Sequence, residues 1–310
     1  MKIRIKDLGL SVQTLDAPVR QVVGELVAKG LVFRPRFYLG DEWFSPEGVP
    51  AVSIPFAFAH PRLMALEREM LGELEGDDPS YFLRLLRHEV GHCLDHAYLL
   101  SRTRRWRTVF GSPAQEYDPD HFRPKAYSKA FVSNLQGHYA QSHPDEDFAE
   151  TFAVWLDPSR DWKREYARRP AALAKLCYVD EVVSGLGARA PRVRGGAVMS
   201  AASRMRSTLA SHYDRRRRGL AQDLKGFFDA DLRRVFSGGE GGIPAPEFLA
   251  GRRQSLVDTV AHWTREPKYT ILKIVDRLVR RSAELGLRVT GPEERAAVET
   301  AAFLSALVTG

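Results

Sequence analysis

Apolar residues recur at helical spacing over residues 80–100. They stand at positions 82, 85, 86, 90, 93, 94 and 97, and no proline interrupts the run. Steps of three and four residues place these side chains on one face of an α-helix, so the pattern predicts a helix from about Ser80 to Leu100. Ser80 is a candidate N-cap, because a serine hydroxyl can accept a hydrogen bond from the first turn.

A second amphipathic pattern covers residues 144–156. Its apolar stripe consists of Phe148, Phe152, Trp155 and Leu156. Pro144 suits the first turn of a helix, and the three acidic residues that follow it interact favourably with the helix dipole. We therefore predict a second helix that starts near Pro144.

The remaining first half alternates short strand and helix patterns. Strands are expected at residues 2–8, 31–39 and 49–57, and helices at 17–29, 61–74 and 128–135. The third strand contains Pro50 and Pro55, which confine it to a sheet edge or to partial pairing. Such an edge either presents backbone donors and acceptors to an extended peptide or is plain scaffold.

The second half of the sequence is mainly helical. A helical pattern covers residues 158–184, and residues 186–200, rich in glycine, form the best linker of the chain. Further helices are expected at 220–236, 256–263, 271–285 and 293–308. We therefore predict one domain over residues 1–185, a linker over 186–200 and a helical region over 201–310.

The bulk composition is that of a soluble globular protein. The chain has 310 residues, 44% hydrophobic and 27% charged, and no apolar run approaches the ~20 residues of a membrane span. The N-terminus lacks the apolar core of a signal peptide. Cys93 and Cys177 are the only cysteines, so we expect no disulfide framework and a reducing compartment, hence the cytoplasm.

The net charge is +7, and part of it lies in two arginine clusters. The clusters are residues 102, 104, 105 and 107, and residues 215–218. A basic surface can steer anionic partners, nucleic acid included. Because no nucleic-acid-binding fold signature accompanies the charge, a solvated arginine face is the favoured interpretation, and neither nucleic acid nor a membrane is an expected partner.

The stretch His88-Glu89-Val90-Gly91-His92 lies inside the first long helix. Histidines four positions apart stand on the same face, and two imidazoles so placed can bind one tetrahedral Zn²⁺. A glutamate beside the first histidine can take a proton from metal-bound water. The alternative is a pair of surface or core histidines on an ordinary helix. A zinc enzyme also needs a third protein ligand and one open coordination position.

Glu146 and Glu150 are the candidates for the third ligand. They lie one turn apart on the second predicted helix, on a face other than its apolar stripe. Two acidic side chains on a half-buried helix need a compensating partner, and a zinc ion bound by His88 and His92 is one that the sequence offers. His96, one turn further along the first helix, would need a longer reach, and we expect it to be structural or to support a ligand.

These motifs resemble the gluzincin metallopeptidases, in which H-E-x-x-H is followed further along the chain by E-x-x-x-E or E-x-x-x-D. The sequence is similar to that of a bacterial family of zinc-binding metallopeptidases (Peptidase_Mx-like) at Pro55-Phe56, at residues 88–92 and at residues 144–156. The stretch Glu146-Asp147-Phe148-Ala149-Glu150 also resembles the catalytic helix of anthrax lethal factor and its relatives.

The resemblance implies a role for each matching residue. In the lethal-factor group the first glutamate is a zinc ligand, the second supports a ligating histidine, and a tyrosine seven residues upstream faces the oxyanion. The matching positions are Glu146, Glu150 and Tyr139. Two alternatives stay open. The register can differ by one turn, which makes Glu150 the ligand and leaves Glu146 exposed, or Tyr139 can simply pack on the core.

The sequence thus predicts an α+β fold: a zincin-like metallopeptidase domain with a small mixed sheet, followed by a mainly helical C-terminal region. The leading hypothesis is a cytoplasmic zinc metallopeptidase that cleaves a peptide or protein substrate. Its metal ligands are His88, His92 and Glu146. Glu89 is the general base and Tyr139 the oxyanion donor. The alternative is a non-catalytic binding or regulatory protein whose basic helical half holds a protein or nucleic-acid partner, and a DNA-associated factor is a third option.

Overall fold

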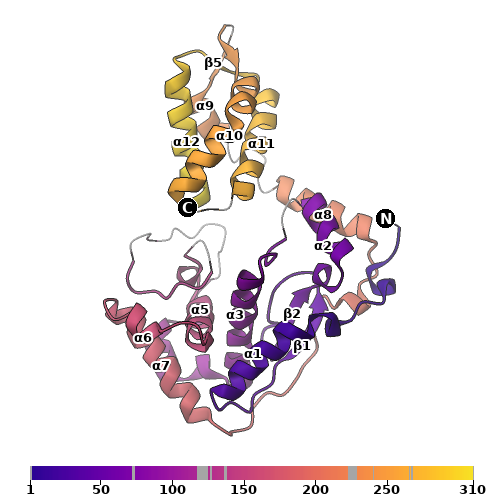
Figure 1. Cartoon of the computed structure of the whole chain (residues 1–310), viewed down its shortest axis with the longest axis vertical. Helices are drawn as coiled ribbons and strands as arrows, with labels where there is room; N and C mark the ends of the chain where they lie inside the picture. The colour runs from indigo at the N-terminus through magenta and orange to yellow at the C-terminus, as the bar shows by residue number, and fades with distance from the viewer. Residues whose placement is uncertain are drawn as a thin grey trace. The chain divides into compact units, whose positions relative to one another are not determined.

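The computed structural model describes residues 2–71, 74–116, 125, 128–135, 138–222, 229–239, 241–264, 266 and 268–309. The chain forms two compact units, which are coloured along the chain in Figure 1. The first comprises Met1–Glu67 and Leu74–Ala210, and the second comprises Arg68–Glu73 and Ser211–Gly310. Helices and a few short strands build both units, so the mixed helix-and-strand class expected from the sequence is confirmed.

The first unit contains the two long helices expected around the histidine motif. Its helices are α1 (Asp16–Ala28), α2 (Pro61–Leu71, whose last residues belong to the second unit), α3 (Pro79–Tyr98), α4 (Arg104–Phe110), α5 (Pro144–Leu156), α6 (Trp162–Glu165) and α7 (Pro170–Leu186). Its strands are β1 (Arg36–Gly40) and β2 (Ala51–Pro55). The helices expected at 17–29, 61–74 and 144–156 are confirmed to within a few residues.

Helix α3 lies in the middle of the first unit, between α5 and α1 in Figure 1. It begins one residue earlier than expected, because its N-cap is Asp78 and not Ser80. The Asp78 carboxylate accepts hydrogen bonds from the backbone N–H groups of Ser80 (3.0 Å) and Tyr81 (2.9 Å). The helix ends where Leu99 adopts a left-handed conformation with φ 57°. A carboxylate at an N-cap satisfies N–H groups that the helix itself leaves free.

Helices α3 and α5 pack at very short range, and Gly91 is the reason. A Cβ atom at Gly91 would lie 3.0 Å from Ala149 Cα and 3.1 Å from Phe152 Cδ1, closer than ordinary van der Waals contact. The backbone of α5 therefore occupies the space that a side chain at position 91 would fill. This contact brings the histidine face of α3 against the acidic face of α5.

The sheet of the first unit has two parallel strands. The register runs from Arg36 opposite Ala51 to Gly40 opposite Pro55, and all five residues of β2 are buried. On the other edge of β2, the Ser53 N–H donates to Phe44 O at 2.8 Å. The expected edge strand is present, but at Ser53 the chain's own loop already occupies its outer edge.

Two expectations for the first unit are wrong, and a third is confirmed only in part. Residues 2–8 form no strand: Ile5–Leu8 is a short 3-10 helix, and Arg4 makes only an isolated bridge to Thr208. Residues 128–135 form no helix, because the N–H groups of residues 133–135 donate to side chains instead of to helix carbonyls. Only the last part of the strand expected at 31–39 pairs, as β1.

The segment expected as a linker, residues 186–200, is hydrogen-bonded to the first unit. The N–H groups of Arg192 and Val193 donate to Ala97 O at 2.8 and 3.0 Å. Arg36 Nη2 donates to Gly196 O at 2.8 Å. The two units separate after Ala210, downstream of this segment.

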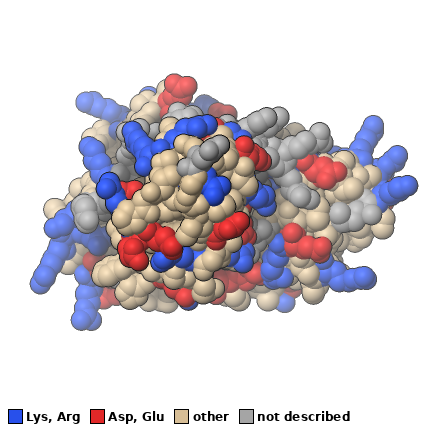
Figure 2. Space-filling model, turned by 90° about the horizontal axis from the view of Figure 1, so that it is seen from above, with Lys and Arg blue, Asp and Glu red and all other residues tan. Residues whose placement is uncertain are grey.

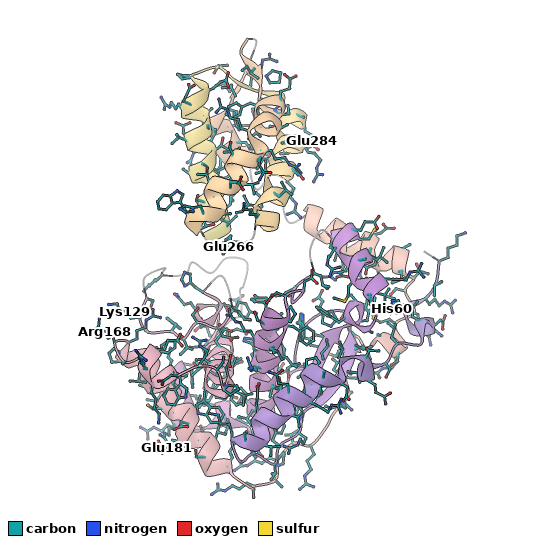
Figure 3. The ribbon with its side chains drawn as sticks, viewed as in Figure 1. His60, Lys129, Arg168, Glu181, Glu266 and Glu284 are labelled. Carbon is teal, nitrogen blue, oxygen red and sulfur yellow. The ribbon has the colours of Figure 1, made fainter. Side chains whose placement is uncertain are left out.

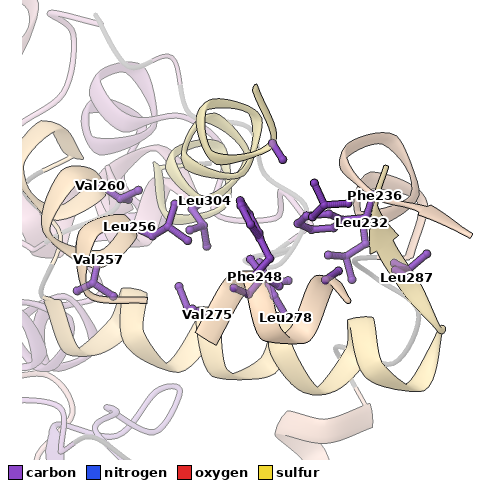
Figure 4. Packing of buried hydrophobic residues seen from close by; sticks show 14 of the residues in the cluster. Leu232, Phe236, Phe248, Leu256, Val257, Val260, Val275, Leu278, Leu287 and Leu304 are labelled. Atoms are coloured by element: carbon purple, nitrogen blue, oxygen red, sulfur yellow. The ribbon is translucent and has the colours of Figure 1, made fainter. Parts of the chain in front are cut away.

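The second unit is a helical body with its own core. Its helices are α8 (Leu209–Gln222, which begins in the first unit), α9 (Asp229–Val235), α10 (Ala245–Thr264), α11 (Lys268–Glu284) and α12 (Glu293–Thr309). Figure 4 shows side chains such as Phe236, Phe248 and Leu278 packed between these helices. The sequence did not predict the small antiparallel sheet, whose strand order is β3 (Ser237–Gly238), β5 (Leu287–Val289), β4 (Ile243–Pro244).

The distribution of charged and apolar side chains is relevant to the partners that the sequence suggested. On the face drawn in Figure 2, Lys and Arg side chains are interspersed with Asp and Glu side chains. Within the first arginine cluster, Arg105 pairs with Glu181, which Figure 3 labels on α7. Among the described residues, no helix combines the length and apolar character that crossing a bilayer requires.

Candidate metal centre

Two imidazole nitrogens of α3 point at each other. His88 Nε2 and His92 Nε2 are 3.1 Å apart, and the two rings are nearly perpendicular at 77°. His88 is 2% exposed, so its ring lies in the interior between α3 and α5. Two lone-pair nitrogens brought this close repel one another unless a cation lies between them, as a proton or a metal ion.

A carboxylate from α5 completes a triangle with these nitrogens. Glu146 Oε2 lies 3.0 Å from His88 Nε2 and 3.2 Å from His92 Nε2. These three residues form a group that can hold a metal ion. A tetrahedral zinc site with bonds of about 2.0–2.1 Å has ligand atoms about 3.3 Å apart, so the donor types and their spacing both fit zinc.

The electrostatics of the triangle favour a positive charge at its centre. Burial lowers the pKa of His88, but hydrogen bonds and charges from Glu146 and Glu150 outweigh burial and hold that pKa well above its usual value. Burial raises the pKa of Glu146, but the two histidines outweigh it and hold that pKa far below its usual range. A divalent cation would satisfy the same attraction more fully than a shared proton.

Glu150 contacts the other nitrogen of His88. Its Oε1 lies 3.0 Å from His88 Nδ1, and the carboxylate is fully buried. If Nδ1 carries the proton and donates it to Glu150, the Nε2 lone pair faces the triangle. The structure therefore places Glu146 at the triangle and Glu150 behind His88, and Glu146 is buried rather than exposed as the alternative register required.

Glu89 is buried beside the triangle and has an unused acceptor. Its Oε2 has no hydrogen-bond partner among the described residues, and the residue is 6% exposed. Burial raises the pKa of Glu89, while His88 and His92 lower it less strongly. An orphaned carboxylate oxygen in the interior needs a partner, and water is the small donor that fits such a group.

Tyr139 begins a short 3-10 helix, Tyr139–Gln141, just before α5. Its ring centroid lies 5.7 Å from that of His88, with an interplanar angle of 46°. The side chain is half-buried. The structure thus brings this tyrosine next to a histidine of the triangle.

Two other histidines of this region do not join the triangle. The His96 ring stacks on His92 with centroids 6.5 Å apart, and its Nδ1 is 3.4 Å from Ser45 Oγ. His143 caps α5: its Nδ1 accepts from Asp145 N at 3.1 Å, and its Nε2 lies 3.0 Å from Gln115 O. Both nitrogens of His143 are thereby engaged.

A buried arginine next to the motif was not predicted from the sequence. Arg87 donates to both carboxylate oxygens of Glu25 on α1 and to Asp157, the C-cap residue that follows α5, each at 2.8 Å. Its side chain is 6% exposed. It ties α3 to α1 and to the end of α5. The signal available was an arginine directly after the apolar pair 85–86, at a position where a surface charge looks ordinary.

Comparison with known families bears on the same region. One family model carries the description "Putative zinc-binding metallo-peptidase". Residues 76–166 match it. The matched region contains α3, α5 and every residue of the triangle, so the expected family resemblance is confirmed over that region. The likeness to lethal factor stays a prediction.

Known relatives share the same limited coverage. Uncharacterized proteins of Mycobacterium bovis and Mycobacterium tuberculosis are 35% identical over an alignment of 101 residues, and the match covers 29% of this chain. The match spans only 28% of the length of each relative. No solved structure matches the chain.

Proposed function

We propose that the chain is a zinc-dependent metallopeptidase of zincin-like fold that hydrolyses peptide bonds in a peptide or protein substrate. One observation carries the proposal. Ligand-type atoms of His88, His92 and Glu146 lie within 3.2 Å of one another, in the same interior as Glu89 Oε2, which has no hydrogen-bond partner in the described part of the chain. The match of residues 76–166 to a family described as zinc-binding supports it.

The residues have distinct roles in this proposal. His88, His92 and Glu146 would hold the zinc ion, which when bound would acidify water and polarise a carbonyl group. Glu89 accepts the proton of the attacking water at Oε2 and returns it to the leaving amine. Burial raises the pKa of Glu89, and a raised pKa suits a group that must both take up and release a proton. Tyr139 donates a hydrogen bond to the developing oxyanion.

The test separates metal binding from chemistry. Zinc content and cleavage of a peptide library are measured for the whole chain and for Glu89→Gln and Glu146→Ala. We expect Glu89→Gln to retain zinc and lose cleavage, and Glu146→Ala to lose zinc. Glu181→Gln, at an exposed carboxylate that pairs with Arg105, is the matched control and is expected to change neither property.

The outcomes decide between the candidate roles. Normal zinc binding by Glu146→Ala would refute the ligand assignment. Zinc binding without cleavage of any peptide would favour the non-catalytic binding role.

The cytoplasm is the proposed location. Cys93 and Cys177 are both free thiols, as a reducing compartment would keep them.

A further inference from the structure

We propose that Asn134 is a positioning residue of the metal centre, which acts through Glu150 to fix the orientation and tautomer of His88. The inference rests on the zinc-binding function proposed above. Asn134 lies in a loop of residues 132–135, here called the Asn134 loop, where the sequence suggested an ordinary helix. In the structure this loop instead donates hydrogen bonds to the Glu150 carboxylate.

The Glu150 carboxylate faces donors on every side. Oε1 lies 3.0 Å from His88 Nδ1 and accepts from Asn134 Nδ2 at 3.2 Å. Oε2 accepts from the backbone N–H groups of Asn134 and Leu135, each at 2.8 Å. Three of these four contacts come from two consecutive residues of one loop. The loop therefore holds the carboxylate in one orientation, with Oε1 directed at His88.

Both amide hydrogens of Asn134 have acceptors. Nδ2 lies 3.2 Å from Glu150 Oε1 and 3.3 Å from Arg84 O. Because both neighbours are acceptors, the NH₂ end of the amide must face them. Arg84 lies one turn before His88 in α3, so this one side chain joins the α3 backbone to an α5 carboxylate.

The Asn134 loop itself is anchored to the segment around α6. Ser133 N–H donates to the Tyr166 hydroxyl at 3.1 Å, and Arg160 Nη1 donates to Ser133 O at 3.2 Å. Val132 is 1% exposed. These contacts hold the donors of the loop in place independently of the triangle.

The consequence for zinc follows from the position of the proton on His88. A fixed acceptor at Nδ1 keeps the proton there and leaves Nε2 as the ligand atom. Without the Asn134 amide, Glu150 Oε1 loses its donor from the loop, and the two backbone donors that remain hold Oε2 alone, so the direction of Oε1 toward His88 is fixed less tightly. Partners behind a metal ligand typically change metal affinity by about ten- to a hundredfold, and we expect Asn134→Leu to weaken zinc binding by about tenfold.

The experiment is a double-mutant cycle on the whole chain. Zinc affinity is measured by competition with a chromophoric chelator for the wild type, Asn134→Leu, Glu150→Gln and the double variant. The visible absorption of the cobalt-substituted proteins reports the ligand field directly. Ser133→Ala, an exposed neighbour in the same loop, is the control and is expected to match the wild type.

If Asn134 acts through Glu150, its effect on zinc affinity disappears in the Glu150→Gln background, and its cobalt spectrum shifts in the same direction as that of Glu150→Gln. Undiminished zinc affinity in Asn134→Leu, or effects that simply multiply in the double variant, would overturn the inference alone. A wild type that binds no zinc would overturn the proposed function as well. If Asn134→Leu does not fold, Asn134→Ser is measured with the same expectations.

Discussion

Replacing Gly91 by alanine tests whether the α3–α5 contact builds the metal centre. The added Cβ atom would stand 3.0 Å from Ala149 Cα, a backbone atom that cannot move alone. Ordinary carbon contacts are about 3.5–4.0 Å, so α5 must shift by about 0.5–1 Å at this point. Overpacking of this kind typically costs about 1–3 kcal/mol.

A matched control removes the effect of helix propensity. Alanine is favoured over glycine inside a helix by about 1 kcal/mol, and this gain opposes the overpacking cost at Gly91. Gly24 is exposed in α1, and a Cβ atom there would meet no heavy atom of the described residues within 4 Å outside its chain neighbours and its own helix backbone, so Gly24→Ala should gain the propensity term alone. The two alanine variants should therefore differ in free energy of unfolding by about 1–3 kcal/mol, with Gly91→Ala the less stable.

The same shift should disturb the proposed zinc binding. Glu146 travels with α5, and functional sites tolerate displacements of only about 0.5 Å. We expect Gly91→Ala to bind zinc at least about tenfold more weakly, comparable to the loss of a supporting contact.

Urea unfolding followed by tryptophan fluorescence gives the stability of the first unit. Trp106, Trp155 and Trp162 are buried there, whereas Trp263 of the second unit is 78% exposed. Chelator competition gives the zinc affinity. A Gly91→Ala protein as stable as Gly24→Ala, with unchanged zinc affinity, would refute the claim that close approach of α3 and α5 forms the site.

Three further outcomes are expected. Glu25→Ala leaves the buried Arg87 charge with Asp157 alone and should destabilise the first unit by about 3 kcal/mol in urea unfolding; a change below about 1 kcal/mol would contradict this. Asp78→Ala removes the N-cap of α3 and should cost about 1 kcal/mol by the same measurement, and no loss would show that the cap is dispensable. Burial, with nearby arginine charges, lowers the pKa of His212 to about 4, so between pH 6.5 and pH 4 the unfolded chain binds this proton more readily than the folded chain. Stability should therefore fall from pH 6.5 toward pH 4, less steeply in His212→Gln, and equal slopes would exclude the effect.

The sequence was informative where a pattern is local. The spacing of apolar residues predicted α3 and α5, because one buried face and a proline in the first turn are properties of adjacent residues. The ligand types that zinc prefers predicted that His88 and Glu146, 58 positions apart in the chain, lie at one site, and the structure brings their side chains together. The α3 cap was misplaced by two residues, since Asp78 and Ser80 are equally good capping residues in sequence terms.

The failures have a common physical cause. The Asn134 loop looked helical because its residues tolerate a helix, but its N–H groups are used by Glu150 and Tyr166, which are distant in sequence. Residues 2–8 alternate charged and apolar side chains, yet Ile5–Leu8 forms a 3-10 helix, and the backbone hydrogen bonds of this segment to residues 205–209 amount to an isolated bridge at Arg4 instead of a strand ladder. Neither outcome is encoded in neighbouring residues.

A metal ion in the histidine–carboxylate triangle would affect how much of the folded protein a cell contains. His92 and Glu146 are 54 positions apart, so an ion bound by both would cross-link two distant positions of the chain. A ligand that binds only the native state adds about 2.7 kcal/mol to stability at a hundred times its dissociation constant. The lifetime of the first unit would then follow the supply of free zinc, and a metal-starved cell would carry less of the folded protein before any catalysis is considered.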